Sequence, residues 1–112
     1  MGEKNNILHL CVLMSLSDYD QDKREVRAIQ KISKKLNVEF NVLNSFEEIQ
    51  NKFRDDFETA CKFYLNGIET EENKYLAIEY LKEVALADKN LKDREIKLLE
   101  LCKKTWGSSF FE

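Results

Sequence analysis

The scarcity of helix-breaking residues is the feature of this sequence that most constrains its fold. The 112 residues contain no proline and only three glycines. A β-sandwich of this length needs many tight turns, which are usually built with those two residues. Apolar residues make up 43% of the chain and charged residues 35%, a composition unlike that of disordered or membrane-spanning proteins. We therefore expect a single all-α domain over residues 1–112, with a core at about 7–107 and a short tail at 108–112.

Hydrophobic periodicity predicts about five helices in one compact bundle, at residues 4–17, 22–36, 45–66, 70–87 and 92–106. Asn37 and Gly107 follow two of these helices, and both residue types are common where a helix ends in a left-handed conformation. The third helix is expected to start with a capping box formed by Ser45 and Glu48. The fourth is apolar around most of its circumference, which is typical of a central helix. In the last helix we expect these residues to point inward: Ile96, Leu99, Cys102 and Trp106.

A repeat at an offset of 70 residues relates the two ends of the chain. Residues 14–18 (MSLSD) align with 84–88 (VALAD), and residues 24–26 (REV) align with 94–96 (REI). Each copy is predicted to be a helix, a four-residue turn and a second helix. Two such hairpins packed around a long central helix would make one small bundle.

The repeat carries four acids that we select as candidate metal ligands: Asp18, Glu25, Asp88 and Glu95. If the hairpins pack with approximate two-fold symmetry, these carboxylates gather, and a divalent cation such as Ca²⁺ or Mg²⁺ would relieve their repulsion. The alternative is structural. Glu25 forms a capping box with Asp22, and the aspartates bond to free amides of the turns. An EF-hand is excluded, because its sixth position would be Lys23 and its twelfth Ile29.

Other chemistry has little support in the sequence. His9 is the only histidine, so we expect it to be a packing residue and expect no Ser–His–Asp or Cys–His set. No glycine-rich phosphate loop is present. We predict no enzyme activity, no catalytic residues and no site for an organic cofactor.

The cysteines and the charges bear on compartment and partners. Cys11, Cys61 and Cys102 are odd in number and widely spaced, so we expect buried thiols in the cytoplasm rather than a disulfide or zinc framework. Residues 7–17 lack the flanks of a signal peptide, and no stretch is long enough to span a membrane. The net charge is −3, which argues against a nucleic-acid partner. The lysines at positions 31, 34, 35, 103 and 104 suit helix C-termini, and the acids could form a docking face for a basic partner.

The two turns resemble a family motif, A-D-G-x-φ-x-x-x-E, in which φ is apolar. The matching stretches are 17–25 (SDYDQDKRE) and 87–95 (ADKNLKDRE). The pattern is similar to the TerB-like domain of tellurite-resistance proteins and to the N-terminal domain of certain membrane-tethered J-domain co-chaperones. The resemblance implies a non-catalytic helical module whose acids associate with divalent cations. It also implies a protein partner in stress-related complexes at the inner face of the membrane, with peripheral rather than spanning association. A metal-free interaction domain, in which the acids only cap helices, is the alternative.

Overall fold

Helices account for nearly all of the fold. The computed structural model describes residues 2–17, 20–21, 23–54, 56–86 and 93–107; side chains at 16–17, 20–21, 23–25 and 93–94 are outside this description. Within those ranges the elements are α1 (Gly2–Ser15), β1 (Leu16–Ser17), β2 (Asp20–Gln21), α2 (Lys23–Lys35), α3 (Val42–Phe53), α4 (Phe57–Asn66), α5 (Glu71–Leu86) and α6 (Asp93–Trp106). The all-α prediction is confirmed. The prediction of about five helices is corrected to six, and the two-fold relation between the hairpins stays a prediction.

The extra helix comes from a break near residue 54, where the sequence predicts one continuous helix over 45–66. Arg54 has a φ of 53° and ends α3. Asp56 then starts α4 by accepting hydrogen bonds from the Thr59 amide at 3.1 Å and the Thr59 hydroxyl at 2.7 Å. Side-chain capping of this kind satisfies an amide that has no partner inside the helix. Apolar residues recur at helical spacing on both sides of the break, so the sequence pattern predicts one continuous helix.

The first inter-helix turn also differs from the prediction. Between α1 and α2, Leu16 pairs with Gln21 and Ser17 with Asp20 in a short antiparallel ladder. The sequence predicts only a four-residue turn here. Strands of two residues are too short to produce the hydrophobic alternation by which a strand is recognised in a sequence.

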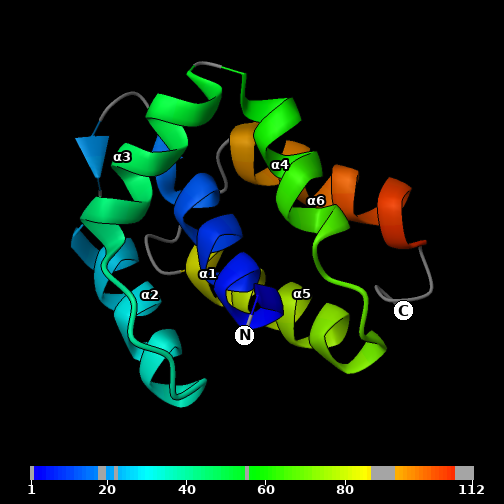
Figure 1. Ribbon diagram of the computed structural model, residues 1–112, viewed down its shortest axis with the longest axis horizontal. Coiled ribbons are helices and arrows are strands. Elements are labelled where there is room, and N and C mark those ends of the chain that lie inside the picture. The colour runs from blue at the N-terminus through cyan, green and yellow to red at the C-terminus, as the bar shows by residue number, and fades with distance from the viewer. Residues whose placement is uncertain (1, 18–19, 22, 55, 87–92, 108–112) are drawn as a thin grey trace.

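Helix α1 lies at the centre of the bundle (Figure 1), with α2 and α3 on one side of it and α4 and α6 on the other. All of its residues from Leu10 to Ser15 are buried, as are Ile7 and Leu8, and it packs most extensively against α5. The prediction that the 70–87 helix would be central is therefore wrong. One side of α5 faces solvent, and the exposed side chains of Tyr75 and Leu86 belong to it.

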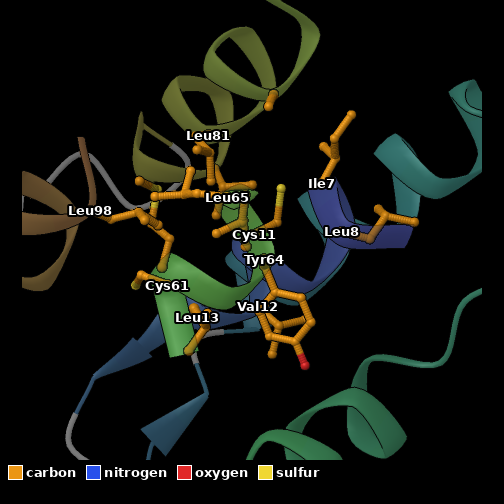
Figure 2. Packing of buried hydrophobic residues seen from close by; sticks show 14 of the residues in the cluster. Ile7, Leu8, Cys11, Val12, Leu13, Cys61, Tyr64, Leu65, Leu81 and Leu98 are labelled. Carbon is orange, nitrogen blue, oxygen red and sulfur yellow. The ribbon is translucent and has the colours of Figure 1, made fainter. Parts of the chain in front are cut away.

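The core joins α1 to α4, α5 and α6 (Figure 2). Ile7, Cys11 and Leu13 of α1 belong to the same buried cluster as Leu65 of α4, Leu81 of α5 and Leu98 of α6. On α6 the inward side is formed by Leu98, Leu101 and Cys102, and Ile96 is 40% exposed rather than inward as predicted.

The predicted ends of two helices are confirmed. Asn37 has a φ of 57°, and its neighbour Val38 donates its amide to the Ser33 carbonyl at 3.0 Å. Gly107 has a φ of 97° and ends α6. Its backbone amide donates a hydrogen bond to the Lys103 carbonyl at 2.9 Å. None of the helices described has both the length and the apolar character needed to cross a bilayer.

Candidate functional site

The four predicted ligands divide into two that the structure places and two that it does not. Glu25 is the third residue of α2 and Glu95 the third residue of α6. Asp18 and Asp88 lie outside the described residues, as does the side chain of Glu25. The two glutamates therefore occupy the same position in the first turn of the helices that follow α1 and α5. Whether the four acids come together stays a prediction.

The Glu95 side chain is the unusual member of this set, because it is 0% exposed. A buried carboxylate is costly unless it is protonated, hydrogen-bonded or bound to a cation. Its place in the first turn of α6 offsets part of this cost, since the positive end of the helix dipole favours an acid there. Leu98 and Cys102, farther along α6, are fully buried as well. The sequence marked Glu95 by its place in the repeat but gave no signal of its burial.

No cluster of three or more histidine, cysteine, aspartate or glutamate side chains occurs among the side chains that the structure describes. That set contains Glu95 but neither aspartate of the repeat. The three cysteines are buried, as predicted. Burial raises the pKa of the Cys102 thiol to about 12 and raises that of Cys11 further. Both thiols are consequently protonated at neutral pH and are poor metal ligands.

A second polar group surrounds His9 of α1, where this helix meets α3 and α4. Its Nδ1 shares a 2.7 Å hydrogen bond with the Ser45 hydroxyl, and its Nε2 lies 4.0 Å from a carboxylate oxygen of Glu48. The imidazole stacks on the Tyr64 ring at 4.7 Å between centroids and meets the edge of Phe40 at 5.3 Å. His9 thus packs against α3 and α4; the sequence predicted a packing residue but not these partners.

This arrangement corrects one expectation about Ser45 and Glu48. The capping box is wrong, because α3 begins at Val42 and its N-cap is Asn41, whose side chain accepts the Asn44 amide at 3.0 Å. The structure also brings Ser45, His9 and Glu48 together, a proximity that the sequence analysis did not anticipate. Ser45 is, however, only 3% exposed, and a nucleophile must be reachable by its substrate. The three-residue spacing of Ser45 and Glu48 on one helix face was the available signal.

The electrostatics of His9 fit a neutral packed imidazole. Burial lowers the pKa of His9, and Lys52 lowers it further, whereas Glu48 opposes both effects. At neutral pH the ring is uncharged and carries one N–H group. This group points to the Ser45 hydroxyl in one tautomer and to the Glu48 carboxylate in the other.

Comparison with known protein families finds a match over most of the chain. A family profile described as "Tellurite resistance protein TerB" matches residues 4–107, which include every helix of the structure except the first two residues of α1. Comparisons with curated proteins and with solved structures give no match. The match confirms the resemblance seen in the two acidic turns: this chain belongs to the TerB family of tellurite-resistance proteins.

Proposed function

We propose that this TerB-family chain is a non-catalytic helical module that binds a divalent cation, Ca²⁺ or Mg²⁺, through Asp18, Glu25, Asp88 and Glu95. In this proposal the module acts in the cytoplasm within a stress-response complex and associates only peripherally with the membrane. The observation that carries the proposal is the complete burial of Glu95 in the first turn of α6. A hard cation with oxygen ligands would stabilise such a carboxylate in its charged form.

The repeat supplies the remaining support. Glu25 holds the same place in α2 as Glu95 in α6, and each follows an aspartate by seven residues. One acid at a helix start is ordinary, since the dipole favours it. Two aspartate–glutamate pairs at matched places in one small domain supply carboxylate oxygens, which are the ligands that Ca²⁺ and Mg²⁺ prefer.

The second candidate is a metal-free interaction domain in which the same acids only stabilise helix ends. The position of Glu95 in the first turn favours this reading too, because a capping carboxylate is found at that point. The two candidates differ in what happens when a cation is added. Cation binding predicts stabilisation that depends on the four acids, whereas capping predicts stability that is independent of ions.

Thermal unfolding in chelator, and then with millimolar Mg²⁺, Ca²⁺, Mn²⁺ or Zn²⁺, tests the proposal. A cation at about 100 times its dissociation constant adds about 2.7 kcal/mol, which raises the unfolding temperature on the order of 10 °C for a domain of this size. We expect this increment for one hard cation, and we expect Asp18→Asn with Asp88→Asn to abolish it.

The matched control is Glu71→Gln with Glu72→Gln. These exposed acids lie in the first turn of α5, so the pair changes the net charge equally at another helix start. The control should keep the full ion increment. If no cation raises the unfolding temperature, or if the control loses the increment as well, the cation proposal is wrong and the metal-free candidate stands.

A further inference from the structure

The strongest local excess of charge on the described surface lies along α2. Apart from Glu25, every charged residue of this helix is a lysine or arginine. Arg27, Lys31 and Lys34 are exposed, and their spacing of three and four residues places them in one stripe along the helix. Lys35 is paired with Glu83 of α5 at 3.4 Å. Within the described part of the chain, no ion pair joins the three stripe residues to another side chain.

A groove of about 600 Å³ lies beside this basic stripe, between α2 and the segment that enters α3. Val26, Arg27 and Gln30 line it from α2, and Phe40 and Leu43 line it from the other side. Leu43 is 63% exposed, whereas Phe40 packs partly against the core. Figure 1 shows α2 and α3 side by side at the edge of the bundle, away from α6. The groove thus combines an apolar wall with a guanidinium group at its margin.

We propose that this α2–α3 groove binds an acidic peptide segment of a partner protein, with one aliphatic or aromatic side chain of that segment seated against Leu43 and Phe40. Carboxylates on either side of the anchor pair with Arg27, Lys31 and Lys34. An exposed apolar side chain beside a line of unpaired cations is complementary to such a segment in both shape and charge. The chain as a whole has a net charge of −3, so its overall charge does not attract an acidic segment, and the attraction in this proposal comes from the stripe.

A peptide fits the surroundings of the groove better than an extended anionic surface does. Exposed Glu39 precedes Phe40 directly, and exposed Glu47 lies one helical turn beyond Leu43. A bilayer or a nucleic acid presents negative charge across the whole face and would meet both acids, which repel it. A narrow segment can lie in the groove and contact only the stripe.

The proposal is independent of the cation site, because it uses none of the four acids of the repeat. Its test uses a fluorescein-labelled peptide of sequence EDELEDFEDE, followed by fluorescence anisotropy at about 50 mM salt, where charge pairing is weakly screened. We expect a dissociation constant on the order of 100 µM, as for a short segment that seats one of its two apolar side chains in the groove. The peptides EDESEDSEDE, without anchors, and QNQLQNFQNQ, without charge, should each bind at least about tenfold more weakly.

Two variants locate the binding surface. Lys31→Glu with Lys34→Glu should weaken binding about tenfold. Leu43→Ser, which removes an exposed side chain and leaves the core intact, should weaken it about fivefold. Lys97→Glu with Lys104→Glu is the matched control, because these exposed lysines lie on α6 and give the same change in net charge. Thermal unfolding confirms that each variant is folded, and amide chemical shifts should move at residues 26–34 and 40–43.

Four results would each overturn the proposal. The first is no binding of EDELEDFEDE at millimolar concentration. The second is an equal loss of affinity in the α6 control, and the third is shift changes confined to other helices. The fourth is binding to phosphatidylserine vesicles without binding to the peptide, which would assign the stripe to a lipid surface. The cation experiment gives its answer independently, since the groove variants keep all four acids of the repeat.

Discussion

The carboxylate of Glu3, near the start of α1, accepts the backbone amide of Thr70 at 2.8 Å and so caps the start of α5 from 67 positions away. The same carboxylate accepts the Glu69 amide at 3.0 Å and the Thr70 hydroxyl at 3.0 Å. Asn73 adds a fourth bond at 3.3 Å. Amides at a helix start have no partner within the helix. The Glu3 side chain satisfies the amides that precede α5 and thereby links the N-terminal turn of α1 to the N-terminus of α5.

Glu3→Gln should therefore lower the unfolding temperature by roughly 5 °C at pH 7. The hydrogen bond from the Thr70 backbone amide is the main cause that lowers the pKa of Glu3 below its ordinary value of 4.5. A group with a lowered pKa stabilises the fold above its unfolded pKa, and this contribution disappears as the pH falls through the folded value. The wild type should thus lose more stability than the variant when the pH is taken from about 5 to 3.

Urea unfolding across this pH range provides the measurement. Glu69→Gln is the matched control, because Glu69 is an exposed acid in the same region whose backbone, not its side chain, takes part in the cap. Equal pH dependence in the wild type and Glu3→Gln would show that the carboxylate does not hold the start of α5.

His9 should titrate below 6.5, and its single imidazole signal can be followed by NMR because no other histidine is present. Burial is the main cause of the lowered pKa, so protonation favours the unfolded chain. Stability from the neutral ring is then fully present above about pH 6.5 and declines as the pH falls toward the folded pKa, by at most about 1.4 kcal/mol per pH unit.

Two neighbours of His9 should move its pKa in opposite directions. Glu48→Gln removes the group that favours the imidazolium and should lower the pKa further. Lys52→Gln removes a nearby cation and should raise it. Both shifts should shrink at high salt, since these side chains face solvent. Shifts of the same sign in the two variants would contradict this account of the site.

The sequence predicted the fold where the determinants are local. Asn37 and Gly107 end their helices because their residue types tolerate a positive φ, which a sequence pattern can use. The central place of α1 could not be read in this way. Its apolar run and that of α5 look alike in sequence, and only packing in three dimensions decides which helix is surrounded. The Glu3 cap was hidden for the same reason, since its partner lies 67 positions away.

The candidate site shows the same division between local and distant causes. The repeat placed Glu25 and Glu95 in the first turns of their helices, which the structure confirms. The burial of Glu95 depends on how α6 packs against α4 and α5, and the repeat contains no information about that. The link between His9 and Ser45 likewise joins residues of two helices, and the spacing of Ser45 and Glu48 was consistent with a cap as well as with a shared face.

Arg54→Gly should stabilise the protein by about 1 kcal/mol. Arg54 has a φ of 53° and a ψ of −120°, a backbone conformation that glycine adopts far more easily than residues with a Cβ atom. Arg54→Ala keeps the Cβ and removes the charge, so it should give no such gain. Urea unfolding of the two variants checks the prediction, and equal stabilisation by alanine would attribute the effect to the lost charge instead.

Gly67→Ala should destabilise the protein by about 1–2 kcal/mol through Asn6. The Asn6 side-chain amide donates to the Gly67 carbonyl at 3.1 Å, and a Cβ atom at position 67 would collide with that same amide. The φ of Gly67 is −81°, so the cost comes from the displaced hydrogen bond and not from the backbone. Asn6→Ala removes both the bond and the obstacle, and adding Gly67→Ala to it should therefore cost little more. Gly2→Ala is the control, because a Cβ atom there meets nothing and the variant should be nearly neutral. Urea unfolding of the single and double variants gives the coupling energy, and simple additivity of the two costs would contradict a shared contact.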